Sequence, residues 1–406
     1  MPRARSLIAP LFAALLVPAA VASTAGVAVG DAGGVPNANA ASGHSHKPVC
    51  QPHGDPSEVR CHAEVVTDAQ GKPLVTPGPA GYGPADLASA YKLSTGGGAG
   101  QNVAIVDAYD DPNAESDLAV YRAQYGLPAC HSNALGTGCF RKFNQLGVQG
   151  LYPGADSGWS EEISLDLDMV SAICPNCGIT LVEANSPTYD NLGQAVNTAA
   201  ANGATEISNS YGGGEFSGEN AYDHYYTHAG IPITVSSGDH GFGVEYPAAS
   251  PGVTAVGGTS LSRATNARGW TETAWSGAGS GCSGVESRPA FQASTNTGCS
   301  RRAVADVSAV ADPSTGVAVY DTYGASGWLV FGGTSVASPI IASVYALAGN
   351  GASIAVGYPN SHTTSLFDIT SGNNGRCRRT PQQLCTAGPG WDGPTGWGTP
   401  NGTGAF

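Results

Sequence analysis

Short apolar runs that alternate with helical stretches constrain this fold more than any other feature of the chain. Five runs have the length and apolar character of strands buried in a parallel sheet: 102–108, 179–184, 206–208, 231–236 and 252–256. Helical patterns lie between them, including 117–125 and 191–202. The alternation predicts an α/β fold, a doubly wound and mostly parallel sheet with helices on both faces. Function in such folds lies at the carboxyl ends of the strands.

Charge and terminal sequence indicate the compartment. The 406 residues carry 31 acidic and 17 basic side chains, a formal net charge of −14, and no basic stripe, so nucleic acid is not an expected partner. Residues 1–22 combine early arginines, an apolar run and a final Ala-Val-Ala, the pattern of a secretory signal peptide rather than of an apolar first helix. No later run is long and apolar enough to span a bilayer. We expect a secreted, extracellular monomer without a membrane partner.

Ten cysteines fall into local pairs, as expected of an exported chain. The predicted disulfides are Cys50–Cys61, Cys130–Cys139, Cys174–Cys177, Cys282–Cys299 and Cys377–Cys385. The spacing of Cys174 and Cys177 also fits a redox motif or half a zinc site, but no second pair at zinc spacing accompanies it. A structural disulfide is therefore the favoured interpretation.

The chain divides into three parts. After the signal peptide, residues 23–81 are poor in long apolar runs and rich in Gly, Pro, Ala and His. We interpret them as a short leader that is either processed or weakly ordered. Residues 82–406 show no repeats or linkers and are expected to form one large domain.

A Gly-Gly-Thr-Ser turn marks a candidate nucleophile. Ser335 follows an apolar strand pattern at 328–331 and precedes an apolar, Ala-rich helix pattern at 340–347. A hydroxyl near the amino end of a helix has free N–H donors and a favourable dipole beside it, which suits a nucleophile whose product is an oxyanion. The alternative is an N-cap serine after a glycine turn.

Three carboxylic acids lie at positions where a catalytic site could form. Glu162 and Asp166 are four residues apart at the start of a helix pattern with Ser160 as its expected N-cap, so both lie on one helix face. They could form a carboxyl pair that shares a proton, or a solvated acidic helix start. Asp239 follows the strand at 231–236 and is either a site residue or a turn-forming aspartate.

Together these segments resemble the sedolisin family, the serine-carboxyl peptidases, which have a subtilisin-like fold. The matching segments are 162–166, 237–241, 333–339, 368–372 and 387–396. They stand in family order over most of the chain after residue 82. The leader is shorter than the folded prodomain usual in this family, which argues against activation by a conventional prodomain.

The resemblance implies a role for each acid. Ser335 attacks the peptide carbonyl, Glu162 takes its proton, Asp166 hydrogen-bonds Glu162, and Asp239 lines the oxyanion hole. An ionised Asp239 would repel an oxyanion, so it has to be protonated to donate a hydrogen bond. A glutamate base has an unperturbed pKa of about 4.3, well below that of histidine. Both constraints predict peak activity in acid.

The resemblance also implies a calcium site near the carboxy terminus. Its ligands would be the side chains of Asp368 and Asp392 and the main-chain carbonyls of Ile369, Gly388 and Gly390. Hard oxygen ligands of mixed kind suit calcium.

The sequence thus predicts a secreted, calcium-stabilised serine-carboxyl endopeptidase that acts on proteins or peptides. A subtilisin-type histidine site is an alternative: Asp107 ends the first strand where its acid would lie, but no His-Gly-Thr follows. A second alternative is a catalytically inactive binding or surface protein on a peptidase scaffold, for which the short leader is the best support.

Overall fold

The computed structural model describes residues 1–2, 44–51, 55, 57–378 and 380–406. Most of the predicted signal peptide, and the leader up to residue 43, lie outside the described residues. Among the helices of the described part, none is long and apolar enough to cross a membrane.

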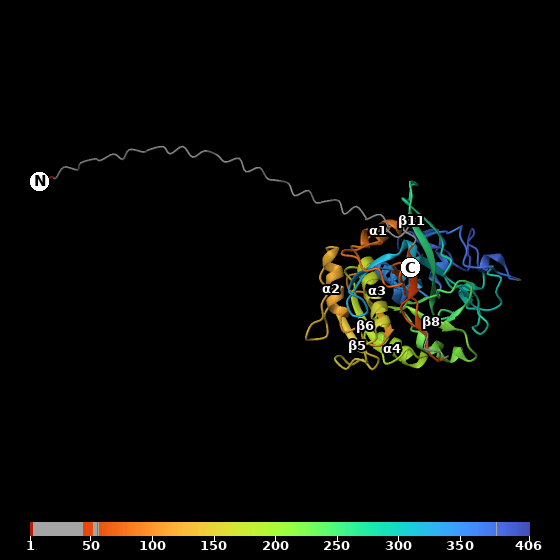
Figure 1. Ribbon diagram of the computed structural model, residues 1–406, viewed down its shortest axis with the longest axis horizontal. Helices are drawn as coiled ribbons and strands as arrows, with labels where there is room; N and C mark the ends of the chain where they lie inside the picture. Colours follow the sequence, from red (N-terminus) through yellow and green to blue (C-terminus); the bar gives the residue numbers. More distant parts are fainter. Residues whose placement is uncertain (3–43, 52–54, 56, 379) are drawn as a thin grey trace. The chain divides into compact units, whose positions relative to one another are not determined.

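An eight-stranded sheet forms the centre, in the order β12-β11-β9-β7-β4-β6-β5 with β15 also beside β11. Its strands are β4 Asn102–Ala108, β5 Phe140–Asn144, β6 Gly178–Ala184, β7 Glu206–Asn209, β9 Ile233–Ser236, β11 Thr254–Arg263, β12 Trp270–Ala274 and β15 Val307–Val310. Only β12 is antiparallel to its neighbour. The predicted parallel sheet is confirmed. The strand expected at 252–256 is longer than predicted, because β11 continues into a hairpin with β12 (Figure 1).

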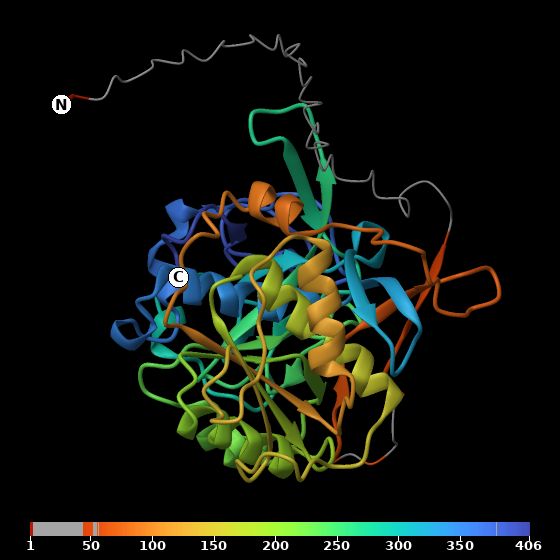
Figure 2. The same cartoon turned by 90° about the vertical axis from the view of Figure 1, so that its left-hand side faces the viewer.

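Helices cover both faces of this sheet, as Figure 2 shows. The α-helices are α1 Pro84–Ala90, α2 Ala114–Gln124, α3 Ser157–Ile173, α4 Tyr189–Ala201 and α5 Thr334–Ala348. Side chains of β4 alternate between the two cores: Val103 and Ile105 pack with α2, α3 and α5, while Ala104 and Val106 pack with α4. This period of two is the strand geometry that the apolar run predicted.

Two helix starts differ from the sequence prediction, and both bear on the site. Helix α3 begins at Ser157, because Asp156 rather than Ser160 is its N-cap and accepts hydrogen bonds from the backbone N–H groups of Gly158 and Trp159. Glu162 therefore lies in the second turn and is fully buried, not at a solvated helix start. Ser335 is likewise not an N-cap, since that position in α5 belongs to Gly333.

A second sheet has the order β1-β3-β17-β16. Strands β16 Val317–Asp321 and β17 Gly327–Gly332 form an antiparallel hairpin, and β17, which contains the predicted strand at 328–331, leads directly to Ser335. Strand β3 Glu64–Thr67 pairs with β17, and β1 Ser45–Pro48 pairs with β3. A three-stranded sheet adds β2 Arg60–Cys61 to β8 Tyr211–Gly214 and β10 Glu245–Tyr246.

These strands change the interpretation of the leader. Residues 59, 61, 63, 65 and 66 are buried hydrophobic residues. Residues 57–67 are therefore not weakly ordered, because β2 and β3 are paired strands within the folded domain. Proteolytic processing of the leader remains a prediction.

The five predicted disulfides are all present. The remaining elements are short: β13 Gly281–Cys282, β14 Ala303–Val304, β18 Leu366–Phe367, β19 Thr399–Pro400, and 3-10 helices Glu219–Tyr226, Ala290–Gln292, Pro313–Thr315, Gly351–Ser353, Tyr358–Ser361, Thr363–Ser365 and Gln382–Leu384.

Candidate active site

Helices α3 and α5 bring Ser335 and Glu162 together. The hydroxyl of Ser335 donates a hydrogen bond to Glu162 Oε2, with an O–O distance of 2.9 Å. The same hydroxyl lies 3.2 Å from the carbonyl oxygen of Ser210. Both side chains are fully buried. A serine hydroxyl directed at a buried carboxylate is the arrangement that a nucleophile and its base require.

Asp166 lies one turn beyond Glu162 on the same helix, as predicted, but its contact differs. Its Oδ1 accepts a hydrogen bond from the hydroxyl of Ser210 at 2.8 Å. Within the described residues no hydrogen bond joins Asp166 to Glu162, and the oxygens Glu162 Oε1 and Asp166 Oδ2 have no partner. The expected direct hydrogen bond is therefore absent, and the two acids interact through their charges.

Asp107 is a third buried acid, and with Glu162 and Asp166 it forms an acid cluster. From the sequence alone, Asp107 was a candidate only as the acid of a histidine triad. It lies near the end of β4, and burial raises its pKa to about 8. Burial, and then the charges of Asp166 and Asp107, raise the pKa of Glu162 well above its usual value. The sequence feature that could have pointed to Asp107 as a site residue is its position at the carboxyl end of a strand. Only the sheet order places it beside α3.

Asp239 follows β9 and faces the start of α5. Its Oδ1 accepts hydrogen bonds from the backbone N–H and the hydroxyl of Thr334, at 2.8 and 2.7 Å. Its Oδ2 has no partner among the described residues. Burial raises the pKa of Asp239 well above the usual range, which favours the protonated carboxyl, the form able to donate a hydrogen bond.

A segment of the predicted leader runs through this site. Strand β2 pairs antiparallel with β8, with Arg60 opposite Gly212 and Cys61 opposite Tyr211. The backbone N–H of His62 donates to the carbonyl oxygen of Ser210 at 3.1 Å. After His62, β3 pairs with β17, the strand that leads to Ser335. An extended peptide is thus held by main-chain hydrogen bonds on both sides of His62.

The carbonyl oxygen of His62 lies beside the nucleophile. It accepts a hydrogen bond from the backbone N–H of Ser335 at 3.4 Å. Gly333, whose φ is 96°, separates it from Asp239: a Cβ there would overlap the His62 carbonyl oxygen and stand 2.7 Å from Asp239 Oδ2. Only glycine fits this position. This contact could not be predicted from sequence pattern, because it joins segments far apart in the chain.

The predicted calcium ligands occupy one loop region. Asp392 is buried, and its Oδ2 accepts the backbone N–H of Gly388 at 3.1 Å, while Asp368 Oδ2 accepts that of Gly390 at 2.9 Å. Burial raises the pKa of Asp392 to about 7, and the charge of Asp368 makes a smaller contribution in the same direction. The described residues hold no group of three or more His, Cys, Asp or Glu side chains able to bind a metal.

These residues nevertheless fit a cation of the predicted kind. Two carboxylates share the region with no positive side chain bonded to them among the described residues. The carbonyl oxygens of Ile369, Gly388 and Gly390 accept no hydrogen bond from described residues. Two acids with unpaired carbonyl oxygens are a donor set that calcium accepts.

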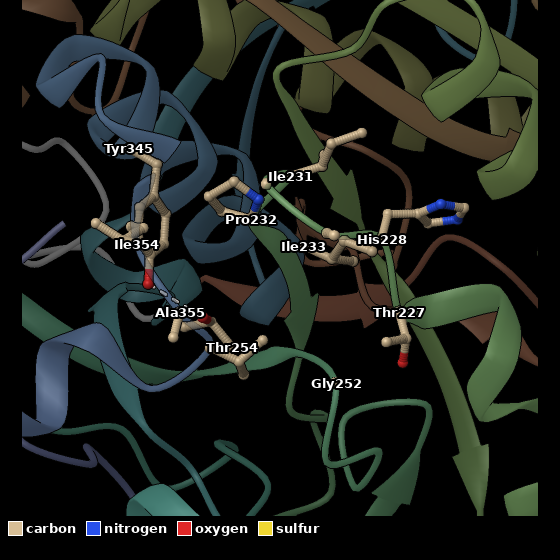
Figure 3. Close-up of a pocket in the computed structure, with 13 residues that line it drawn as sticks. Thr227, His228, Ile231, Pro232, Ile233, Gly252, Thr254, Tyr345, Ile354 and Ala355 are labelled. Carbon is tan, nitrogen blue, oxygen red and sulfur yellow. Dashed lines mark hydrogen bonds between the residues drawn. The ribbon is translucent and has the colours of Figure 1, made fainter. Parts of the chain in front are cut away.

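An apolar pocket of about 320 Å³ lies elsewhere in the domain (Figure 3). Ile231, Pro232, Ile233 and Ile354 contribute to its wall, and Tyr345 hydrogen-bonds Thr254 at 3.1 Å across one side. None of Ser335, Glu162, Asp166 and Asp239 lines it. It is therefore separate from the candidate active site.

Comparisons with known proteins agree with the fold. Residues 119–378 match the Subtilase family. Kumamolisin from Bacillus sp. (strain MN-32) is 31% identical over 408 residues, which cover 90% of this chain and 69% of kumamolisin. Sedolisin from Pseudomonas sp. (strain 101) is 35% identical over 202 residues, 42% of this chain and a third (33%) of sedolisin. Bovine tripeptidyl-peptidase 1 is 34% identical over 41% of this chain and 33% of its own length.

A solved structure supports the same assignment. Pseudomonas sedolisin, a serine-carboxyl proteinase complexed with pseudo-iodotyrostatin, matches with a TM-score of 0.67 at 27% identity, over 79% of this chain and 95% of that chain. The fold and the matches define a serine-type peptidase with a subtilisin-like architecture. Within that class, the chain belongs to the sedolisin family, the serine-carboxyl peptidases.

Proposed function

We propose that this protein is a secreted endopeptidase that cleaves protein or peptide substrates in acid through an acyl-enzyme. The observation that carries the proposal is the hydrogen bond from Ser335 Oγ to Glu162 Oε2 beside the buried acid Asp239. The predicted disulfides, all formed, fit an exported protein.

The first half-reaction forms an ester. Ser335 Oγ attacks the substrate carbonyl carbon as its proton passes to Glu162 Oε2, and the carbonyl electron pair becomes an oxyanion. The backbone N–H of Ser335 and the protonated Oδ2 of Asp239 stabilise that charge. When the tetrahedral intermediate collapses, the amine leaves with the proton that Glu162 returns. Water then repeats the sequence on the ester, with Glu162 again as base, and releases the acid.

The acid cluster sets the pH range. Glu162 acts as a base only when the cluster of Glu162, Asp166 and Asp107 has lost a proton, whereas Asp239 acts only while it keeps its own. Asp166 is a positioning residue: it fixes Ser210 by a hydrogen bond and shares the cluster's charge with Glu162. Activity should therefore fall at both ends of the pH scale, with its acid limit set by protonation of the cluster and its alkaline limit by ionisation of Asp239.

The leader is the first substrate in this proposal. Its main-chain contacts place the His62–Ala63 peptide bond at Ser335, with the His62 carbonyl oxygen where the oxyanion would form. We propose that the chain cleaves this bond itself, so that a mature chain begins at Ala63. The processed part of the leader would then end at His62, whereas the sequence predicted a leader that extends to residue 81.

Calcium has a structural role in this proposal. Asp368 and Asp392, with the carbonyls of Ile369, Gly388 and Gly390, would hold the ion. When bound, it supplies positive charge that offsets the repulsion between the two acids. It takes no part in peptide cleavage.

The test is digestion of a denatured protein by the secreted chain from about pH 3 to about pH 8, a range that spans carboxyl and histidine titration. Ser335→Ala and Glu162→Gln are compared with Glu115→Gln, which removes a partly exposed carboxylate that bonds Ser132 on another part of the surface. Acid cleavage lost only in the first two variants supports the proposal. A folded, processed protein that cleaves nothing would make it an inactive scaffold.

A further inference from the structure

The side chain of His62 is held as specifically as its carbonyl. We infer that the pocket around this ring receives the residue on the amino side of the cleaved bond, and that it selects histidine in substrates. The inference rests on the proposed function and names its substrate class: proteins or peptides with histidine before the cleaved bond.

Both ring nitrogens have a hydrogen-bond partner. His62 Nε2 lies 2.8 Å from Glu245 Oε2, and Nδ1 lies 2.7 Å from the hydroxyl of Ser236. The His62 side chain is fully buried, and Ser236 is too. A neutral imidazole donates to the carboxylate and accepts from the hydroxyl, and an imidazolium donates to both. Either form satisfies the pocket, which is positioned by the end of β9 and the start of β10.

The pocket has backbone walls that fit an imidazole. A Cβ on Gly212 would stand 2.8 Å from His62 Cε1 and 3.1 Å from Glu245 Oε2, so any other residue there would crowd the ring. A Cβ on Gly238, whose φ is 114°, would stand 2.9 Å from Glu245 Cδ. Both glycines lie where main chain approaches the ring and its carboxylate partner closely.

The charge of the pocket also favours histidine. Burial opposes ionisation of both partners: it lowers the pKa of His62, whereas at Glu245 the interactions with His62 and Arg60 outweigh it and lower the pKa of that carboxyl. In the uncleaved chain the other oxygen, Oε1, faces Arg60 Nη2 of the leader at 3.7 Å and His240 Nδ1 at 3.6 Å, and His240 remains beside it after the leader has left. Oε2 thus remains for the substrate side chain. Leucine would leave a buried carboxylate oxygen and the Ser236 hydroxyl unpaired, and lysine would reach the carboxylate without satisfying Ser236.

The contacts distinguish a subsite from an ordinary buried histidine. His62 is held at its N–H by Ser210, at its carbonyl by the N–H of Ser335, and at its ring by Ser236 and Glu245. A substrate residue bound through the same main-chain contacts would place its side chain in the same pocket.

The test is cleavage-site mapping by mass spectrometry, with a mixture of denatured proteins as the substrate. Wild type, Glu245→Gln, Ser236→Ala and the control Glu115→Gln are compared. Histidine before the cleaved bond should be enriched at least about tenfold over its frequency in the mixture, as expected when a buried polar site rejects residues that leave it unpaired. Glu245→Gln and Ser236→Ala should each reduce that enrichment at least about fivefold, while cleavage after leucine changes less than about threefold.

The ratio of histidine to leucine cleavage separates specificity from simple loss of stability, which lowers both. As a second measurement, His62→Leu in the full chain should slow self-cleavage after residue 62 about tenfold or more in a protein whose pocket is unaltered. Efficient cleavage without histidine enrichment, or enrichment unchanged in both pocket variants, overturns the inference and leaves the proposed function intact. No cleavage at any bond by folded wild type overturns the proposed function, and the inference falls with it.

Discussion

The backbone amide of Ser335 donates a hydrogen bond to the carbonyl oxygen of His62, at an N–O distance of 3.4 Å. The strand before His62 pairs with β8 and the strand after it pairs with β17, so the chain's own leader lies across the nucleophile. Ser335 is 0% exposed. Under the proposed function, this segment occupies the site of the full chain, and activity on other proteins requires it to leave.

Loss of the nucleophile should block removal of the leader. If Ser335 cleaves the His62–Ala63 bond, Ser335→Ala should be secreted with that bond intact, while wild type should yield a chain that begins at Ala63. Amino-terminal sequencing and intact-mass measurement distinguish the two. Ser343→Ala, a buried serine of the same helix with no hydrogen-bond partner among the described residues, is the matched control and should be processed normally. Processing of Ser335→Ala at the same bond would assign the cleavage to another protease.

The Cys50–Cys61 disulfide should delay release of the cleaved leader. Strand β1 pairs with β3 on the far side of the cleaved bond, and the backbone N–H of Val49 donates to the carbonyl of Ala63 at 3.1 Å. The disulfide connects this region to β2, so both new ends remain in place after hydrolysis. We expect the double variant Cys50→Ala/Cys61→Ala to reach full activity several-fold faster than wild type, as expected when tethering raises effective concentration.

The measurement for the disulfide is a time course of peptide cleavage after acidification, with leader retention followed by size-exclusion chromatography. Equal rates in both proteins, with the leader lost immediately from wild type, would contradict this expectation.

Asp239 should determine the alkaline limit of activity. Its raised pKa keeps the carboxyl protonated in acid, and its hydrogen bond to the oxyanion is lost as the pH rises through that pKa. Asp239→Ala should lose about 10²-fold in kcat, the usual effect of one oxyanion donor. Asp239→Asn retains an N–H donor that does not ionise, so its pH profile should extend further to the alkaline side. The check is kcat against pH for both variants, and an unchanged alkaline limb in Asp239→Asn would exclude this role.

The folded protein should be more stable in acid than at neutral pH. Burial raises the pKa of Asp111 to about 7, of Glu206 to about 7 and of Glu161 to about 8. The folded state binds these protons more tightly than the unfolded state does. The contribution of these groups to stability is therefore complete at a pH below their pKa values in the unfolded state, and it is lost as the pH rises through their pKa values in the folded state. Each unit of difference between the pKa values of a group in the folded and unfolded states corresponds to about 1.4 kcal/mol in the free energy of unfolding. Calorimetry of Ser335→Ala, which cannot digest itself, should give a higher Tm at about pH 4 than at about pH 8, and the reverse order would refute the assignment.

Removal of calcium should destabilise the protein without altering the chemistry. Binding to the folded state alone stabilises by about 2.7 kcal/mol when free calcium is a hundred times its Kd. A chelator should therefore lower Tm in wild type and have little effect in Asp392→Asn. Since the pKa of Asp392 without a cation is about 7, protons should compete with calcium, and the Tm increase from added calcium should shrink towards acid. Equal chelator effects in the two proteins would place the ion elsewhere.

Local sequence patterns were enough to predict many of the strands, helices and disulfides of this protein. The apolar run in 102–108 specified a buried strand, and the Gly-Gly-Thr-Ser turn after an apolar run placed Ser335 near the amino end of a helix, although α5 begins at Thr334, ahead of the predicted helix pattern. The disulfides were predictable because each joins cysteines close in sequence. Glu162 and Asp239 were found because their positions relative to a helix and a strand are also local properties.

Tertiary structure alone decided what these residues contact. Asp166 bonds Ser210 rather than Glu162, and Asp107 joins the acids, because the order of strands in the sheet fixes which strand ends face α3. The passage of His62 across Ser335 depends on pairing between β2 and β8, some 150 residues apart in the chain. A two-residue strand carries almost no pattern of its own, since its stability comes from the main-chain hydrogen bonds that the folded domain offers it. The sequence therefore determined the candidate catalytic side chains, and the tertiary structure determined what lies against them.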